Sequence, residues 1–352
     1  MPPGAGDFEI TLFGPGYGES IVLHVGDGIW VLIDSCVDTN GTPAALKYLH
    51  GIGLDPEQVV DLVVATHWHD DHIRGMAQLV TTCRRAAFCC AAALCKKEFL
   101  TTVGTLAASS ASRASSGLRE IHGVITQLEG RASEPTHALA NRRVFVRGSC
   151  EIWSLSPDDG VFQNFLGSID DLLPGVNRTR RRARSLSPND VAVVLWVRVG
   201  DIAVLLGSDL ERRGWVRILQ SRERPRGRAS VFKVPHHGSQ NADEPDVWRQ
   251  MLVSEPFALV TSWRLGSNAL PTRRDEQRIC SCTPEAYVTA RRNVRGRSRP
   301  GVVDRTLRES GVKLQRVALA PGAIRLRRPL DDGAWTVETF GTAYKVSGLP
   351  SR

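Results

Sequence analysis

An apolar segment that ends in a cluster of histidine and aspartate constrains this chain more than any other feature. Residues 59–65 (VVDLVVA) are mostly β-branched or apolar, which is typical of a strand buried on both faces of a sheet. The segment Thr66-His67-Trp68-His69-Asp70-Asp71-His72 follows directly. Hairpin and helix signals surround the strand, so we expect a layered α/β or α+β arrangement.

The spacing of these side chains indicates a metal site. In an extended or turning segment, His67 and His69 can point to the same side and share one ion, whereas Asp71 and His72 can reach a neighbouring ion. Imidazole and carboxylate are the ligands of hydrolytic zinc, and they also suit manganese or iron. Two ions about 3.5–4 Å apart can hold a bridging hydroxide and stabilise both the attacking and the leaving oxygen. A polar loop enriched in histidine by chance is the weaker interpretation.

Turn residues and apolar runs predict further elements along the chain. We expect helices over 42–51 and 306–310. Strands are expected over 9–13, 20–25, 29–33, 191–199, 202–206, 230–234, 258–261, 313–319, 323–327 and 336–339. The stretches between these elements contain two Arg-rich segments, near 170–188 and 272–304, which are interpreted as exposed loops.

Charge and cysteine content narrow the choice of partners and compartment. The chain has 45 Lys+Arg against 37 Asp+Glu, a formal charge of +8. This excess favours either a phosphate-binding surface or, equally, an arginine-rich coding habit with solvated faces. No apolar run reaches the roughly 18 residues of a membrane helix, and the start lacks the pattern of a signal peptide. Eight Cys in 352 residues are expected to be reduced, buried thiols in a cytoplasmic protein.

The motif His-x-His-x-Asp-His at residues 67–72 resembles that of the metallo-β-lactamase superfamily. Other segments resemble the soluble hydrolase domain of bacterial DNA-uptake competence channel proteins. They are Gly18-Glu19-Ser20, 31–34 (VLID), 154–157 (SLSP), Asn189-Asp190, 205–211 (LLGSDLE), 233–239 (KVPHHGS), 307–311 and 322–326. The resemblance implies one domain over 1–352, an α/β (α+β) four-layer αββα sandwich of the metallo-β-lactamase fold, with the Arg-rich loops as insertions.

The same resemblance implies two divalent metal ions, with Zn²⁺ expected and Mn²⁺ as the alternative. The implied ligands are His67, His69, Asp71, His72, Asp209 and His237, and Asp209 would bridge both ions. The implied catalytic residues are Asp71, His236 and His237. Which of the two adjacent histidines binds metal, and which contacts a scissile phosphate, is left open. Asp34 is expected to orient the ligand loop rather than to bind metal.

Two segments depart from the pattern of the competence-type domain. Gly207-Ser208-Asp209 stands where Thr-Gly-Asp is usual, and Asn268-Ala269-Leu270-Pro271 stands where a late Gly-His-Pro is expected. No histidine follows His237, so we expect that the second site is weaker, or is completed by His237 or a water. His122 and His137 are interpreted as ordinary surface residues.

These observations predict a metal-dependent hydrolase of phosphoester bonds, with a phosphodiesterase or nuclease as the first expectation. Its partner would be nucleic acid or a nucleotide. Two alternatives remain open: a metallo-hydrolase of esters, thioesters or lactams, and a degenerate metal-binding sensor or binding subunit.

Overall fold

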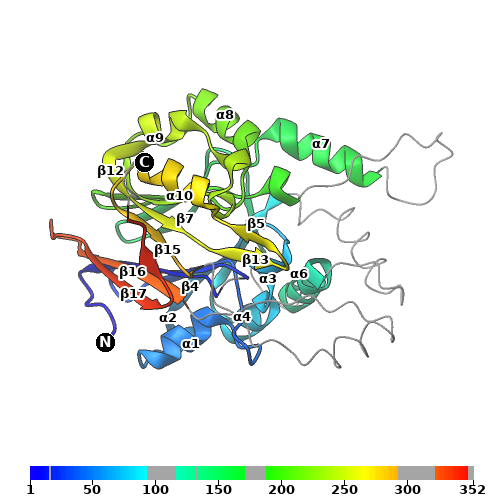
Figure 1. Ribbon diagram of the computed structural model, residues 1–352. Coiled ribbons are helices and arrows are strands. Elements are labelled where there is room, and N and C mark those ends of the chain that lie inside the picture. Colours follow the sequence, from blue (N-terminus) through cyan, green and yellow to red (C-terminus); the bar gives the residue numbers. More distant parts are fainter. Residues whose placement is uncertain are drawn as a thin grey trace, which may run out of the picture.

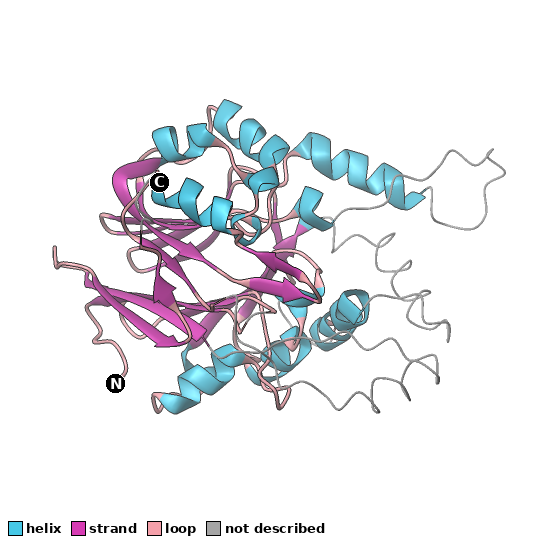
Figure 2. Cartoon of the chain, viewed as in Figure 1, coloured by secondary structure: helices cyan, strands magenta, loops and turns pink. Residues whose placement is uncertain are grey.

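Two mixed β-sheets lie face to face, and helices cover the outer face of each sheet (Figure 1; Figure 2). The computed structural model describes residues 1–15, 17–92, 116–129, 131, 134–170, 188–291 and 322–347. This layering confirms the predicted αββα sandwich of the metallo-β-lactamase fold. The single domain over 1–352 stays a prediction.

The first sheet combines strands from the N-terminal and the C-terminal parts of the described chain. Its order is β17-β16-β1-β2-β3-β4-β5-β6. The strands are β1 (Asp7–Phe13), β2 (Ser20–Val25), β3 (Trp30–Ile33), β4 (Val60–Ala65), β5 (Ala87–Ala91), β6 (Thr136–Ala138), β16 (Gly322–Pro329) and β17 (Thr336–Gly341). The pairs from β3 to β6 are parallel and the others are antiparallel.

The second sheet has the order β18-β15-β12-β11-β10-β9-β8-β7. Its strands are β7 (Arg142–Arg147), β8 (Cys150–Ser154), β9 (Leu195–Val199), β10 (Ile202–Leu206), β11 (Ala229–Lys233), β12 (Leu252–Val260), β15 (Ala286–Val288) and β18 (Tyr344–Lys345). β10, β11, β12 and β15 run parallel. A separate hairpin pairs β13 (Trp263–Leu265) with β14 (Asn268–Leu270).

The helices form the two outer layers. In Figure 1, α1 (Ala44–Gly51), α4 (Met76–Thr82) and α6 (Ser116–Leu128) lie below the sheets, near α2 (Pro56–Val59) and α3 (Asp70–Ile73). Above them lie α7 (Asp159–Asp170), α8 (Arg212–Gln220), α9 (Pro245–Met251) and α10 (Arg273–Cys280). Among the helices that the structure describes, none has the length and apolar character required to cross a membrane.

Alternation along the strands explains why both faces of the second sheet are covered. In β10, Val204 and Leu206 belong to the core shared by the two sheets. The intervening Ala203 and Leu205 pack in a second core, beneath the upper helices. Successive side chains of a strand point to opposite faces, so a wholly apolar strand of this kind requires a layer on each side. Because both faces of the sheet are buried, the carboxyl ends of its parallel strands form a rigid edge.

Most strands predicted from the sequence are confirmed, but residues 272–291 differ from the loop expected there. The segment contains α10 and β15, and Thr272 and Asp275 form a capping box at the start of α10. Arg273 and Arg274 are exposed, because the arginines lie on the solvated side of a short helix rather than in an irregular loop. The predictions for 171–187, 292–304, 306–310 and 313–319 lie outside the described residues.

Candidate metal centre

The candidate site lies where strand ends from the two sheets meet. In the first sheet, Asp34 follows β3 and the segment 66–72 follows β4, which is parallel to it. In the second sheet, Asp209 follows β10, His237 follows β11 and Thr261 follows β12. Ligands in layered α/β folds bind outside the carboxyl ends of parallel strands. The site therefore joins residues that are far apart in the sequence.

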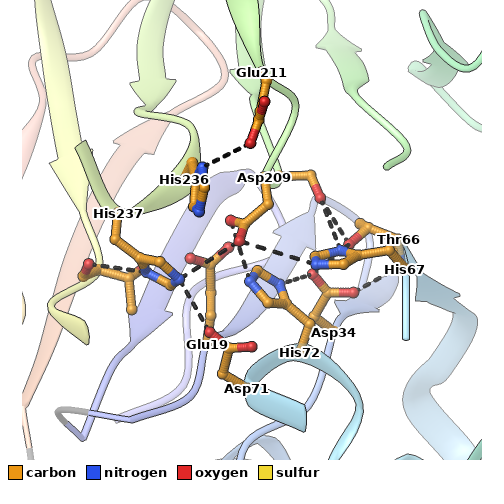
Figure 3. Close-up of polar contacts among 12 residues, drawn as sticks. Glu19, Asp34, Thr66, His67, Asp71, His72, Asp209, Glu211, His236 and His237 are labelled. Atoms are coloured by element: carbon orange, nitrogen blue, oxygen red, sulfur yellow. Dashed lines mark hydrogen bonds and ion pairs between the residues drawn. The ribbon is translucent and has the colours of Figure 1, made fainter. Parts of the chain in front are cut away.

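Left-handed backbone conformations concentrate at this site. Seven non-glycine residues among those described have positive φ, and four of them are Asp34 (56°), Ser208 (46°), His236 (46°) and His237 (55°). Such conformations are disfavoured for residues with a Cβ and persist only where the surrounding structure enforces them. At His236 and His237 they turn two consecutive side chains in different directions. One ring enters the cluster, and the other turns toward Glu211 (Figure 3).

Two groups of potential ligands share one carboxylate. The first group is His67, His69 and Asp209, and the second is Asp71, His72, Asp209 and His237. Within each group, the candidate ligand atoms lie within 4.8 Å of one another. Asp209 belongs to both groups and lies at the centre of the cluster in Figure 3. This arrangement fits two adjacent ions with a bridging carboxylate.

Several buried atoms of these groups have no hydrogen-bond partner. They are Nε2 of His67, Nε2 of His72 and Oδ1 of Asp209. The latter two lie 3.2 Å from each other. A buried polar atom without a partner is costly, so these atoms are explained best as ligands of an ion. The donor set, imidazole with carboxylate, is the one that zinc accepts.

Each of three histidines is held through Nδ1, which leaves Nε2 to face the cluster. His72 Nδ1 lies 2.8 Å from Asp34 Oδ2, and His237 Nδ1 lies 3.2 Å from the carbonyl oxygen of Thr261. These oxygens can only accept, so each Nδ1 donates a proton. A histidine ligand is usually oriented by such a hydrogen bond from its other ring nitrogen.

His67 is oriented through a short chain of hydroxyl groups. The Thr66 hydroxyl donates to Asp34 Oδ2 at 2.7 Å, so toward His67 Nδ1, 3.0 Å away, it can only accept. Ser208 donates to the same hydroxyl at 2.8 Å. The backbone N–H of Thr66 also donates to Asp34, at 2.8 Å. Asp34 therefore orients the ligand loop, which is the role expected for it from the sequence.

The sequence analysis missed a buried ion pair beneath the cluster. The Lys233 ammonium lies 2.7 Å from Glu19 Oε1, and both side chains are almost wholly buried. Lys233 also donates to the carbonyl oxygen of Ser208 at 2.9 Å and lies 3.9 Å from Asp209 Oδ1. The Glu19 backbone N–H donates to the carbonyl oxygen of Asp71 at 2.7 Å. The pair thus connects the loops that carry two of the ligands. Both residues stand in quoted motifs, but nothing in the sequence shows that they meet.

The electrostatics of the cluster keep its carboxylates ionised. Burial alone would raise the pKa of Asp209, but the charges of His72 and His237 hold this pKa well below its usual value. Burial would raise the pKa of Asp71 as well, but the hydrogen bond from His237 and the charges of His72 and His237 together lower it. Burial lowers the pKa of His67 well below the ordinary value. For His72, burial acts in the same direction, but Asp209 and Glu19 raise its pKa well above that value.

His236 lies beside the ligand groups rather than within them. Its Nδ1 lies 3.9 Å from Glu211 Oε1, and its side chain is partly exposed. Burial lowers the pKa of His236, so its ring is neutral at neutral pH. Of the two adjacent histidines, the structure brings His237 to the cluster, with Nε2 lying 3.1 Å from Asp71 Oδ2.

The remaining sequence candidates belong to neither ligand group. His122 and His137 are exposed, as predicted. Asn268–Leu270, the stretch without the late histidine, is the second strand of the β13–β14 hairpin. Most of the cysteines that the structure describes are buried. Cys95 lies outside the described residues.

Comparison with known proteins finds a family model that matches part of the chain. Residues 13–143 match the model of the metallo-beta-lactamase superfamily. This span contains the whole motif at 67–72, and it ends before Asp209. No curated protein sequence matches the chain.

Solved structures show a weaker likeness. A HARLDQ-motif mutant of a metallo-beta-lactamase from Cronobacter sakazakii is 13% identical, with a TM-score of 0.35, over 61% of this chain and 70% of that chain. The metallo-beta-lactamase SMB-1 is 11% identical, with a TM-score of 0.35, over 64% and 76%. Zn²⁺-bound PqqB from Methylobacterium extorquens is 12% identical, with a TM-score of 0.32, over 60% and 58%.

Proposed function

Given a metallo-β-lactamase superfamily chain with a buried cluster of histidine and aspartate, we propose that it is a metal-dependent hydrolase of phosphodiesters, acting on nucleic acid or nucleotides. One observation carries the proposal: two groups of buried ligand atoms share the Asp209 carboxylate, and several of those atoms have no other partner. Two adjacent cations suit phosphoryl chemistry, in which charge on both the attacking and the leaving oxygen needs to be stabilised.

The metals would be held by His67, His69 and Asp209 on one side and by Asp71, His72, Asp209 and His237 on the other. When bound, such ions polarise the phosphoryl group and activate water. The chain's own part is to position these groups. Asp34, Thr66 and the carbonyl of Thr261 fix the imidazole rings. Because the rings are fixed before substrate arrives, little reorganisation is needed during the reaction.

Two side chains are placed to orient the attacking water and the substrate. Asp71, whose low pKa keeps it ionised, would accept a hydrogen bond from the attacking water and orient it. His236, neutral and partly exposed beside the cluster, is placed to donate an N–H hydrogen bond to a phosphate oxygen. We base these proposed roles on the positions and charges of the two side chains. They assign His236 to the substrate and His237 to the metal.

Two further observations favour a polyanionic substrate over an ester, thioester or lactam. The formal charge of +8 attracts phosphate-bearing molecules. The order of motifs also resembles that of the hydrolase domain of DNA-uptake competence proteins, and kinship with that domain is part of the proposal.

The test is a substrate screen with protein loaded with Zn²⁺ or Mn²⁺. Single- and double-stranded DNA, RNA, small nucleotide diesters, a thioester and a lactam reporter would be compared. We expect metal-dependent hydrolysis of a phosphodiester that is abolished by Asp71→Ala and retained by Asp158→Ala, which changes a surface aspartate paired with Arg217. Turnover of only the thioester or lactam, or phosphodiester turnover by metal-free Asp71→Ala/Asp209→Ala protein, would contradict the proposal.

A further inference from the structure

Two aromatic rings lie beside the metal centre and belong to neither ligand group. The ring centroid of Trp263, on β13, lies 6.3 Å from that of His237, and the two planes differ by 28°. The ring of Tyr17, in the loop before β2, lies 6.3 Å from Trp263. The Arg74 guanidinium lies 5.6 Å above the ring of Tyr17. An aromatic and cationic surface thus continues from a candidate metal ligand.

The loop that carries Tyr17 is tightly fixed. Gly18 has a φ of 119°, and a Cβ at this position would lie 2.5 Å from the Cβ of Cys36, so only glycine fits here. The next residue, Glu19, is held by its backbone hydrogen bond to Asp71 and by its buried ion pair with Lys233. Tyr17 is therefore held in place by the same contacts that support the ligand loops.

The segment that carries Trp263 is fixed as well. Trp263 pairs with Leu270 in the β13–β14 hairpin, and Thr261, two residues earlier, accepts from His237. In Figure 1, the hairpin extends from the upper half of the molecule toward α3, which follows the first two histidines of the motif. The hairpin includes Asn268–Leu270, where the competence-type domain would place its late histidine.

Exposure and charge suit this surface to a ligand. The rings of Tyr17 and Trp263 are partly exposed, and the side chain of Arg74 is 43% exposed. Burial, together with the charges of Asp71 and Asp70, raises the pKa of Tyr17 to about 12. The phenol is therefore neutral throughout the physiological range and does not repel an anionic substrate.

We propose that Tyr17 and Trp263 form a stacking subsite for an unstacked nucleobase next to the scissile phosphate, with Arg74 beside it for a neighbouring phosphate. The inference rests on the proposed function and names its substrate class. Every nucleobase offers a π face, and stacking on an aromatic side chain contributes about 1–3 kcal/mol per base. Such a platform selects single-stranded or frayed nucleic acid, because a paired base is not free to stack on protein.

Binding of two ligands that differ only in the base tests the subsite directly. Isothermal titration would compare thymidine 5′-monophosphate with deoxyribose 5-phosphate, using metal-loaded protein. We expect the nucleotide to bind roughly tenfold more tightly, the ratio that corresponds to about 1.4 kcal/mol. Trp263→Ala should bring this ratio close to one, whereas Trp263→Phe, which keeps a ring, should preserve most of it.

Trp153→Ala is the matched control. Trp153 lies on β8, where it contacts Glu151 and Arg143 rather than the metal centre, so its loss should leave the ratio unchanged. Equal binding of both ligands by the wild type, or an unchanged ratio in Trp263→Ala, would overturn the subsite.

The experiments can contradict the proposed hydrolase without contradicting the stacking subsite, and the reverse. A base preference that depends on Trp263, without phosphodiester turnover, would support the subsite and overturn the hydrolase. Turnover without any base preference would do the reverse.

Discussion

The two groups of candidate ligands differ in completeness and in burial. The group of Asp71, His72, Asp209 and His237 has four members, all of them buried. The group of His67, His69 and Asp209 has three members, and His69 is partly exposed. Lys233 and Glu19 support the first of these groups from below, and the Thr261 carbonyl fixes its last histidine.

This difference indicates how one cluster can both retain an ion and keep a position for the reaction. A closed set of buried ligands is typical of a retained ion, whereas a catalytic site keeps one position open for water or substrate. We infer that the four-membered group holds its ion more tightly. By the same reasoning, the three-membered group would keep a position open for water or substrate.

The largest expected effect comes from removing the ligand that both groups share. Asp209→Asn keeps the size of the side chain but removes its charge, so both ions should be lost and hydrolysis should fall to background. Metal content would be measured by elemental analysis after dialysis, beside circular dichroism to confirm folding. Two retained ions in Asp209→Asn would show that the carboxylate is no bridge.

The next largest effect separates the groups. His237→Ala should remove the tightly held ion, whereas His69→Ala should remove the weaker one and leave one ion per chain. Titration with a chromophoric chelator gives the affinity of each remaining site. Loss of the more tightly bound ion from His69→Ala would contradict the proposed difference in affinity between the two groups.

A third prediction concerns the support beneath the four-membered group. Removing one partner of a buried ion pair costs about 3–5 kcal/mol, because the other charge stays buried and unpaired. Lys233→Met should therefore lower the free energy of unfolding of the metal-free protein by about that amount, as measured by urea denaturation. Glu19→Gln/Lys233→Met should recover much of the loss. A loss in the double variant equal to the sum of the losses in Glu19→Gln and Lys233→Met would exclude coupling between the two residues.

The smallest effect is a dependence of metal affinity on pH. The raised pKa of His72 means that this ring is protonated in the metal-free protein at neutral pH. Its contribution to metal-free stability is thus fully present below about pH 6.5 and is lost as pH rises through the folded pKa. An ion must displace this proton, so affinity should rise about tenfold per pH unit until that pKa is passed. Calorimetry in two buffers of different ionisation enthalpy counts the released proton, and affinity that is independent of pH would contradict the assignment.

The sequence predicted the fold and most of the cluster because those signals are local. The buried strand and the segment 67–72 are contiguous, and Asp209 follows an apolar strand. The choice between His236 and His237 was not predictable, because left-handed backbone at both positions decides which ring turns inward.

The long-range contacts were not predictable from the sequence either. Lys233 ends a strand and Glu19 begins another, and only the meeting of the two sheets brings them to 2.7 Å. At 272–280, the arginine-rich composition indicated a loop, although Thr272 and Asp275 carry the capping signal of a helix. The resemblance to competence proteins stays a prediction.

The location of the cluster at the junction of the two sheets has a consequence for folding. An ion held by His72 and His237 would act as a reversible cross-link between segments more than 160 positions apart in the sequence. Ligand binding to the native state alone stabilises it by about 2.7 kcal/mol at a hundredfold excess over the dissociation constant. Metal supply would then affect the lifetime of the chain as well as its activity, because a larger fraction of metal-free chains would be unfolded and accessible to proteases.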